Sequence, residues 1–511
     1  MAAEDRRNPW PNEHNWPYFG EVKFDADQLS VMLSETGVRD GPLHKRVSGG
    51  LRILIERGEL PARSILPSER SLAIALCVSR TTVVTAYQEL QEEGRIERRR
   101  GSGTRVRPPA FDDRETVSAL ALAGSDTSSS FLDGPLATLD LSTAALPGLP
   151  IVAEVAAGLT GADYAALVAQ HHGYHPRGIL PLRQRLAHWY TEAGIPTSED
   201  EILITGGAQQ ALELITNGCL QPGDDVVVER PTYRGALEVF ARSGCRLCEV
   251  PCDRSGVDVS ALDALASARV PRLCYLQSAV HNPLGTVLSD DRRLRLRQLL
   301  RRHPSLIVVD DTSLAGTLFE EEAPPPGFAA PEAPDRVIVI GSMSKLFWGG
   351  LRLGWIRAST RVISRLARMK GRLDFGTSLV SQQIGLRLLE YVPEARATRR
   401  VQLTRGLTDL TGLLGDLLPD WTWDDPRGGP SLWVRLPHGD ATHLAPMALR
   451  FGVAILPGAV FSADSTTKDY LRLPYALPRD VLTAGVQRLA AAWHAYSRHE
   501  AADIDLHSVT T

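Results

Sequence analysis

The sequence contains no hydrophobic run approaching the roughly 20 residues that a membrane-spanning helix requires, so no transmembrane segment is expected. It also lacks an apolar core near its start, because MAAEDRRNPWPNEHNWPYFG carries acidic and proline residues instead. A secretory signal needs such a core. We therefore expect a cytoplasmic protein with a weakly ordered extension over residues 1–40.

Cysteine is scarce, with six residues in 511, yet three of them stand close together as Cys245, Cys248 and Cys252. This spacing suggests a metal cluster. The surrounding sequence predicts a β-strand, however, and neighbouring side chains of a strand point to opposite faces. No pair of histidines follows at the spacing of a zinc site. We therefore expect small buried side chains at these positions and no metal site.

The whole chain has no strong excess of either charge sign, since its net charge is −4. Its charged residues are distributed unevenly, however. Residues 41–107 contain 13 Lys and Arg against 7 Asp and Glu, a local charge of +6. Because 511 residues exceed what one hydrophobic core usually serves, this basic segment is expected to be a separate domain. A basic excess suits contact with a phosphate backbone, and a solvated charged face is the alternative.

The basic segment has the pattern of three helices followed by a hairpin. Apolar residues recur at helical spacing in PLHKRVSGGLRILIERG, and two shorter helices follow, with Ser68 and Ser79 as N-caps. Two short helices with a tight connection form a helix-turn-helix, in which the start of the second helix enters the major groove of DNA. RIERRRGSGTRVRP predicts two short strands around a turn, a basic wing. The predicted DNA contacts are Ser68, Arg70, Ser79, Arg80, Thr81, Thr82, Arg99, Arg100 and Arg105.

These elements resemble the GntR-type winged-helix domain. The resemblance rests on LPSERSLA, VSRTTVVTAYQELQEEG and RRRGSGTRV, three elements in the family's order and spacing over about residues 42–106. It implies a DNA-binding domain over residues 41–107, with a double-stranded DNA operator as partner. The chain departs from the pattern at Cys77, where a glycine is usual in the turn. A helical adaptor with a hairpin is the alternative interpretation.

Beyond the basic segment, composition changes twice. Residues 108–135 are rich in Pro, Ser, Ala and Asp and are expected to form a linker. Apolar runs such as EILIT, DVVVE, RLCYL, LIVVDD and RVIVIGS then alternate with helical stretches. This alternation predicts an α/β fold with a mostly parallel sheet and helices on both faces. Ligands of such sheets bind at the carboxyl ends of the strands, so polar residues there are the candidates for chemistry.

At or just after the end of each apolar run stands a residue that could take part in binding or catalysis. Gly207 and the residues after it open a helix whose amides suit a phosphate. Tyr233 can cover a flat ring, and Asn282 offers an amide held by a proline turn. Asp310 could keep a pyridine nitrogen protonated, and Lys345 offers an amine.

In this order the residues resemble a fold-type I pyridoxal 5'-phosphate (PLP) enzyme of the class I aminotransferase kind, over about residues 136–497. The resemblance implies that Lys345 forms a Schiff base with the cofactor and that Asp310 pairs with its pyridine nitrogen. It also implies that Asn282 contacts the ring hydroxyl and that Tyr233 stacks on the ring. The implied phosphate ligands are Gly207, Ala208, Gln209, Ser342 and Arg352.

Two further residues extend the resemblance to a ligand and a partner. Arg472 in YLRLPYAL matches the arginine that receives a substrate α-carboxylate. Tyr174 in GYHPRG matches a tyrosine that reaches the phosphate of the neighbouring subunit, which implies a homodimer. The resemblance also implies a smaller C-terminal α+β subdomain from about residue 360, which leaves residues 498–511 as a tail.

A GntR-type segment joined to such a body resembles the MocR family of transcriptional regulators, in which the aminotransferase-like domain is a sensor. The chain departs from this family at Thr312, where a tyrosine usually donates to the ring oxygen. Thr312 has a shorter reach, so we expect ligand binding with little or no turnover.

Two functions from different classes remain. The first is a DNA-binding transcriptional regulator that uses PLP to sense an amine, an amino acid or PLP itself. The second is an active PLP-dependent aminotransferase to which the DNA-binding segment adds regulation. The fused segment favours the first, whereas steady turnover of an amino acid with a 2-oxo acid would favour the second.

Overall fold

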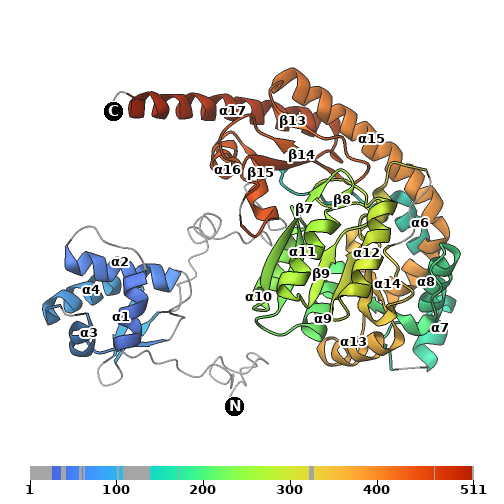
Figure 1. The fold of residues 1–511 in the computed structure, drawn as a ribbon, viewed down its shortest axis with the longest axis horizontal. Helices are drawn as coiled ribbons and strands as arrows, with labels where there is room; N and C mark the ends of the chain where they lie inside the picture. Colours follow the sequence, from blue (N-terminus) through green and yellow to red (C-terminus); the bar gives the residue numbers. More distant parts are fainter. Residues whose placement is uncertain are drawn as a thin grey trace, which may run out of the picture. The chain divides into compact units, whose positions relative to one another are not determined.

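The computed structural model describes residues 26–35, 42–56, 60, 64–76, 78–99, 103–107, 138–170, 172–321, 327–464 and 466–508. The chain divides into two compact units, Met1–Gly124 and Ser125–Thr511, which we call the head and the body (Figure 1). The predicted linker, residues 108–135, lies outside the described residues.

The head is a winged helix, as the sequence predicted. Leu51, Val83 and Leu90 are fully buried among its helices, and the Tyr87 hydroxyl donates to the carbonyl of Pro67 at 3.0 Å. Its strands form an antiparallel sheet in the order β1-β3-β2. The elements are α1 (Ala26–Glu35), α2 (Leu43–Glu56), β1 (Ile65–Leu66), α3 (Glu69–Ala75), α4 (Arg80–Glu92), β2 (Ile96–Arg99) and β3 (Gly103–Val106).

The predicted weakly ordered extension over residues 1–40 is wrong for residues 26–35, which form α1. Leu29 on this helix is fully buried in the head core, and Met32 and Leu33 pack against that core. The prediction extended the polar and proline-rich composition of the first residues over a stretch that has its own apolar face.

The body contains an eight-stranded sheet, which confirms the predicted α/β class. All pairings are parallel except those of β12 and β8 with their neighbours. Strands in the middle of the sheet are buried on both faces, which explains their continuous apolar sequence. Across the sheet the strands are β5 (Ile202–Thr205), β12 (Gly354–Arg357), β11 (Val337–Ser342), β10 (Ile307–Asp311), β9 (Leu273–Leu276), β6 (Asp225–Arg230), β7 (Arg246–Asp253) and β8 (Gly256–Val257).

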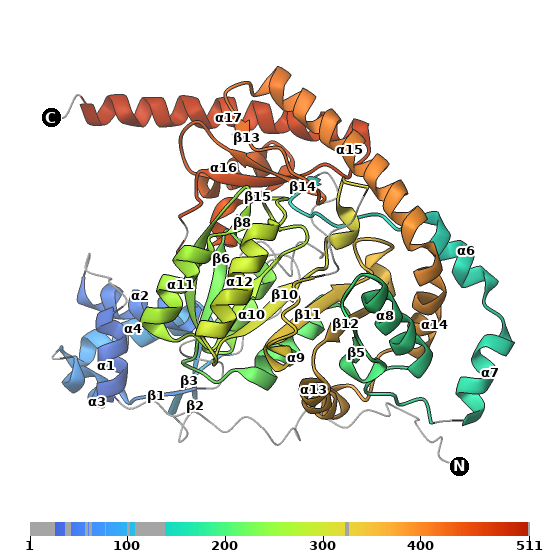
Figure 2. The ribbon, with the colours of Figure 1, turned by 45° about the vertical axis from the view of Figure 1, so that its right-hand side comes forward.

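Helices cover both faces of this sheet, and Figure 2 shows α8 and α14 packed together at one end of it. One face packs against α9 (Ala208–Cys219), α10 (Arg234–Arg242) and α13 (Thr360–Leu373). The other face packs against α8 (Leu180–Glu192), α11 (Val259–Arg269), α12 (Asp290–Arg302) and α14 (Leu379–Leu388). The remaining elements of this part are α6 (Pro150–Gly158), α7 (Gly161–Gln170) and the 3-10 turns η2 (Glu199–Glu201), η3 (Ala315–Thr317), η4 (Pro334–Arg336), η5 (Gly349–Leu351) and η6 (Leu389–Tyr391).

A second, five-stranded sheet forms the smaller α+β part of the body, and α15 and α17 lie against it (Figure 1). Its strand order is β13-β14-β16-β15-β4. Its elements are β4 (Leu139–Leu141), α15 (Val392–Leu417), β13 (Thr422–Trp423), β14 (Ser431–Arg435), α16 (Ala441–Arg450), β15 (Val453–Pro457), η7 (Gly458–Phe461), β16 (Tyr470–Pro474) and α17 (Arg479–Ser508).

One predicted boundary in the body is wrong. The smaller part does not begin near residue 360, because α13 buries Ile363 and Leu366 in the core of the large sheet. α17 continues to Ser508, so residues 498–508 of the predicted tail are helical. Among the helices of the described residues, none has the length and apolar character needed to span a membrane.

Candidate functional site

The predicted phosphate loop lies where β5 and β11 end and where β12, which is between them in the sheet, begins. Gly354 on β12 is paired with Thr205 on one side and with Ser342 on the other. Gly207 is the N-cap of α9 and has a φ of 114°, which favours glycine. A Cβ at Gly207 would lie 3.2 Å from Nη2 of Arg352. The start of α9, its free amide donors and this guanidinium therefore form a cradle that suits an anion.

A hydrogen-bond network through Gln210 and Asp374 holds this loop in place. The Gly206 amide donates to Oε1 of Gln210 at 2.7 Å, and Nε2 of Gln210 donates to Oδ2 of Asp374 at 2.7 Å. Lys370 on α13 is fully buried, and its amine donates to both Asp374 oxygens at 2.7 Å. Lys370 therefore has a structural partner, and no sequence pattern indicated the supporting roles of Gln210 and Asp374.

Lys345 lies on the turn after β11 and has no such partner. Its amine donates to the carbonyl of Ala144 at 2.9 Å, and no carboxylate of the described residues forms an ion pair with it. Burial, together with the positive charges of Arg472 and Arg399, lowers the pKa of Lys345 to about 8. A large fraction of the amine is then neutral near physiological pH, and a neutral amine is a nucleophile.

Arg472 on β16 is a buried cation with an unused donor. One Nη donates to the carbonyl of Ser142 at 2.7 Å, and the guanidinium lies 5.1 Å from the ring centroid of Phe461. Its Nε is buried and has no hydrogen-bond partner among the described residues. Burial lowers the pKa of Arg472 to about 10. A carboxylate ligand would satisfy both the charge and the free donor.

Tyr233 and Asn282 are held in place on neighbouring strand ends. Tyr233 is the N-cap of α10, and its hydroxyl donates to Oε1 of Gln209 at 3.2 Å. Burial raises the pKa of Tyr233. The backbone amide of Asn282 donates to Oε1 of Gln277 at 3.1 Å, and the backbone carbonyl of Asn282 accepts from Nε2 of Gln277 at 3.2 Å. Gln277 therefore positions Asn282, a role that the sequence pattern did not reveal.

Asp310 is fully buried, but its contacts are not with the residues around Lys345. Its carboxylate accepts from the amide and hydroxyl of Ser278 at 2.9 and 2.6 Å, and from the amide of Phe328. Burial raises its pKa. The next residue, Asp311, points to the opposite sheet face and accepts from the Tyr275 hydroxyl at 2.8 Å. The structure thus places Asp310 at the expected strand end without joining it directly to Lys345.

Thr312 is buried, and its hydroxyl donates to the carbonyl of Ile340 on the neighbouring strand at 2.7 Å. The hydroxyl hydrogen therefore binds to the backbone of the sheet. A tyrosine at this position could not make the same short contact, because its hydroxyl lies much farther from the backbone.

Arg399 on α15 links the two segments that surround Lys345, and sequence reasoning missed it. It is fully buried and donates to the carbonyls of Pro147, Leu346 and Phe347 at 2.6 to 2.9 Å. Leu346 directly follows Lys345. One guanidinium therefore satisfies three backbone acceptors on both sides of the amine, and a single arginine in a charged helix gave no signal of this.

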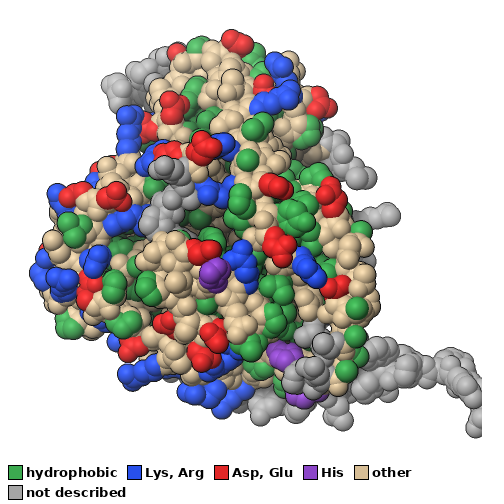
Figure 3. Space-filling model, turned by 90° about the vertical axis from the view of Figure 1, so that its right-hand side faces the viewer, with side chains coloured by type: hydrophobic (Ala, Val, Ile, Leu, Met, Phe, Trp, Pro, Cys, Tyr) green, Lys and Arg blue, Asp and Glu red, His purple; other side chains and the backbone are tan. Residues whose placement is uncertain are grey.

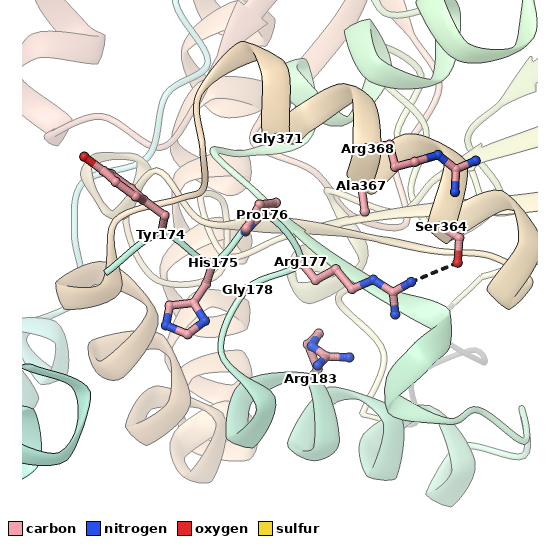
Figure 4. Close-up of a pocket in the computed structure, with 10 residues that line it drawn as sticks. All are labelled: Tyr174, His175, Pro176, Arg177, Gly178, Arg183, Ser364, Ala367, Arg368 and Gly371. Atoms are coloured by element: carbon pink, nitrogen blue, oxygen red, sulfur yellow. Dashed lines mark hydrogen bonds between the residues drawn. The ribbon is translucent and has the colours of Figure 1, made fainter. Parts of the chain in front are cut away.

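Tyr174 is not part of this group of residues. Its side chain is 60% exposed and contacts the ring of Phe375, with centroids 5.4 Å apart. It borders a cleft of about 530 Å³ that also exposes the guanidinium groups of Arg177, Arg183 and Arg368. In Figure 4 its ring points away from these arginines, and Arg177 donates to the Ser364 hydroxyl at 2.8 Å.

In the head, the two predicted N-caps are present. The Ser68 hydroxyl accepts from the Ser71 amide and the Ser79 hydroxyl from the Thr82 amide, both at 3.1 Å. These caps fix the start of α3 and α4. Arg70, Arg80 and Thr81 are exposed, Thr82 is partly exposed, and Arg105 lies on β3. Arg100 and the side chain of Arg99 lie outside the described part of the head.

Arg472→Gln removes a positive charge beside the Lys345 amine, so the pKa of Lys345 should rise from about 8 toward its ordinary value. The measurement is the pH dependence of acylation of Lys345 in cofactor-free protein, followed by mass spectrometry. Wild type should be labelled with a midpoint near pH 8 and the variant at higher pH. Arg405→Gln, an exposed change on α15, is the control. An unchanged midpoint in Arg472→Gln would contradict the charge coupling.

Comparisons with known proteins agree with both units. Residues 140–489 match the class I and II aminotransferase family, and residues 43–106 match the gntR family of bacterial regulatory proteins. In structure, LysN of Thermus thermophilus, an alpha-aminoadipate aminotransferase complexed with N-(5'-phosphopyridoxyl)-L-leucine, is similar with a TM-score of 0.63 and 29% identity. The similarity covers 74% of this chain and 98% of LysN.

Two regulators are similar over most of their length. YdfD of Bacillus subtilis, an HTH-type transcriptional regulator, is 30% identical over 467 residues, which are 85% of this chain and 92% of YdfD. MocR of Rhizobium meliloti, a probable rhizopine catabolism regulatory protein, is 28% identical over 423 residues, or 78% of this chain and 82% of MocR. The chain therefore belongs to the MocR-type transcriptional regulators, which join a GntR-family winged helix to a class I and II aminotransferase domain.

Proposed function

We propose that this protein regulates transcription by binding an operator through its head, and that its body binds PLP and senses an amine, an amino acid or PLP itself. The observation that carries the proposal for the body is the Lys345 amine, which donates to the carbonyl of Ala144 without an ion pair among the described residues, and whose pKa is lowered to about 8 by burial and by neighbouring cations. An amine in this state is suited to reaction with a carbonyl group.

The residues at these strand ends offer groups that suit the parts of PLP. The cradle at Gly207, with Ala208, Gln209, Ser342 and Arg352, would hold the phosphate, and space for it exists because Gly207 has no Cβ. Tyr233 would cover the ring, Asn282 would contact the ring hydroxyl and Asp310 would pair with the pyridine nitrogen. When bound, PLP supplies a carbonyl carbon that combines with amines and a ring that withdraws electrons.

Arg472 makes an amino acid the favoured kind of ligand. Its buried Nε has no hydrogen-bond partner among the described residues, and its charge acts on the Lys345 amine. A ligand carboxylate bound to Arg472 would place an amino group close to Lys345. A simple amine would leave this donor unsatisfied, which costs roughly 1–3 kcal/mol for a buried group.

Thr312 favours sensing over catalysis. Its hydroxyl hydrogen binds to the carbonyl of Ile340 and is not free to donate to a ring oxygen. Proton transfer would then be poorly tuned, so we expect ligand binding with little or no turnover. The alternative, an active aminotransferase, is supported by the joint presence of Lys345, Arg472 and the phosphate cradle.

A homodimer is supported by the exposed surface around Tyr174. Several large apolar side chains on α7, α8, α13, α14 and the adjoining loops are exposed, and Figure 3 shows apolar side chains among charged ones on the side where α7 and α8 lie. Large exposed apolar side chains are typical of association surfaces when they gather together. The large exposed apolar side chains of this chain on these elements are Val168, Tyr174, Leu180, Leu373, Phe375 and Val380. We place this dimer in the cytoplasm, where bacterial DNA is found.

Arg80→Ala should weaken binding to a selected operator by about 1–3 kcal/mol, because an arginine at the start of the recognition helix can read a base edge. Affinity is measured with the full-length protein at fixed salt. Gln91→Ala changes an exposed residue at the other end of α4 and is the matched control. Wild-type affinity in Arg80→Ala would refute the assigned orientation of α4 on DNA.

Borohydride should attach the cofactor permanently to Lys345 in protein incubated with PLP, because reduction converts the imine bond to a stable amine. Peptide mass spectrometry should locate the label on Lys345 and not on Lys370, whose amine is paired with Asp374. Lys345→Ala should lose the label, and Lys468→Ala, an exposed change, should retain it. A label on Lys370 in the wild type would overturn the assignment.

A further inference from the structure

Three side chains that could hold a metal ion lie together at the carboxyl ends of neighbouring strands of the large sheet. Glu229 is near the end of β6, Cys252 is near the end of the adjacent β7, and His281 follows β9 on the other side of β6. Their ligand atoms all lie within 4.8 Å of one another. The sequence had suggested Cys252 only as a neighbour of Cys245 and Cys248, which do not belong to this group.

The distances within this group resemble those of a tetrahedral zinc site. Nε2 of His281 lies 3.3 Å from Oε2 of Glu229, and Sγ of Cys252 lies 3.7 Å from Oε1 of Glu229. Bond lengths of about 2.0–2.2 Å to nitrogen and oxygen and about 2.3 Å to sulfur place tetrahedral ligands roughly 3.3–3.7 Å apart. Each of these two contacts has the length of such an edge, but they run to different oxygens of Glu229, so the carboxylate must turn to present one oxygen to a metal.

The histidine supplies an independent indication of a ligand. His281 is 2% exposed, and its Nε2 makes no hydrogen bond within the described residues although it points at Glu229. Glu229 is also 2% exposed, and burying a carboxylate without a compensating charge is costly. A divalent cation between the three side chains would satisfy the nitrogen and neutralise the carboxylate.

We propose that Glu229, Cys252 and His281 form a binding site for one divalent cation of the zinc class, because thiolate, imidazole and carboxylate together are the ligands that zinc takes. Binding replaces the proton of the Cys252 thiol by the metal and releases one H⁺ to solvent. It also requires the His281 proton to lie on Nδ1, which gives up the long 3.4 Å bond from the Leu284 amide.

The surroundings support the geometry and connect it to the cofactor site. The Gln277 amide donates to Oε2 of Glu229 at 2.9 Å, which orients the carboxylate as outer contacts of metal ligands commonly do. Gln277 also holds Asn282, which directly follows His281. A bound cation would therefore stiffen the side of the site that carries Asn282, without any contact to Lys345.

The test is metal uptake by the full-length protein after removal of metals with a chelator, with Co²⁺ as the spectroscopic probe. Wild type should bind one Co²⁺ per chain with a thiolate-to-cobalt absorption band, and Zn²⁺ should displace it. Cys252→Ser should lose the band and bind at least about tenfold more weakly. Cys248→Ser, on the same strand but outside the group, should behave as wild type.

A second variant keeps the test decisive if Cys252→Ser does not fold. His281→Gln should also weaken Co²⁺ binding at least about tenfold while its circular dichroism stays unchanged. Stripped wild type that takes up no Co²⁺ would overturn the proposal, as would a Cys252→Ser variant with the wild-type band. The readout does not involve PLP, so the outcome is separate from that of the proposed function.

Discussion

Buried positive charge at the edge of the large sheet is the constraint on which the rest of the site depends. Lys345 and Arg472 lie close enough for one charge to act on the other, and no carboxylate of the described residues forms an ion pair with either. Uncompensated buried charge is unfavourable. The Lys345 amine donates to the carbonyl of Ala144 and Arg472 donates to the carbonyl of Ser142, while Arg399 holds the following segment through the carbonyl of Pro147. Such a site is prepared for anionic ligands, which supply the missing charge when they bind.

The sheet topology brings these groups together from distant parts of the sequence. The loop at Gly207 and the turn at Lys345 follow β5 and β11, which are separated in the sheet by β12 alone. Arg472 comes from the smaller sheet, on β16. A carboxylate bound at Arg472 would therefore connect the smaller part of the body to the large sheet, and a sensor needs a movement or stiffening of this kind.

Much of this could be predicted from the sequence, because strand ends are marked by apolar runs followed by polar residues. The positions of Gly207, Tyr233, Asn282 and Lys345 after strand ends were predicted in this way. The position of Thr312 was also clear, but its bond to Ile340 was not, since a hydrogen bond to a neighbouring strand depends on register. Sequence position likewise could not show that the Asp310 carboxylate accepts from Ser278, because this contact joins β10 to the residues that follow the neighbouring β9.

The residues that sequence reasoning missed act through tertiary contacts alone. Arg399 is one of many arginines in a helix, and only its complete burial distinguishes it. His281 and Cys252 lie 29 positions apart, and no short motif relates them. The core position of Leu29 was missed because the residues before it are polar and rich in proline. In each case the signal is a packing partner far along the chain, which composition and local periodicity do not contain.

The proposed function requires that ligand binding at Lys345 change the affinity of the head for DNA. The most direct measurement is the affinity of the full-length protein for an operator selected from random DNA, with and without PLP, at fixed salt. We expect this affinity to change about fivefold or more in the wild type and not at all in Lys345→Ala. Equal affinity of the wild type in both conditions, with PLP demonstrably attached to Lys345, would contradict it.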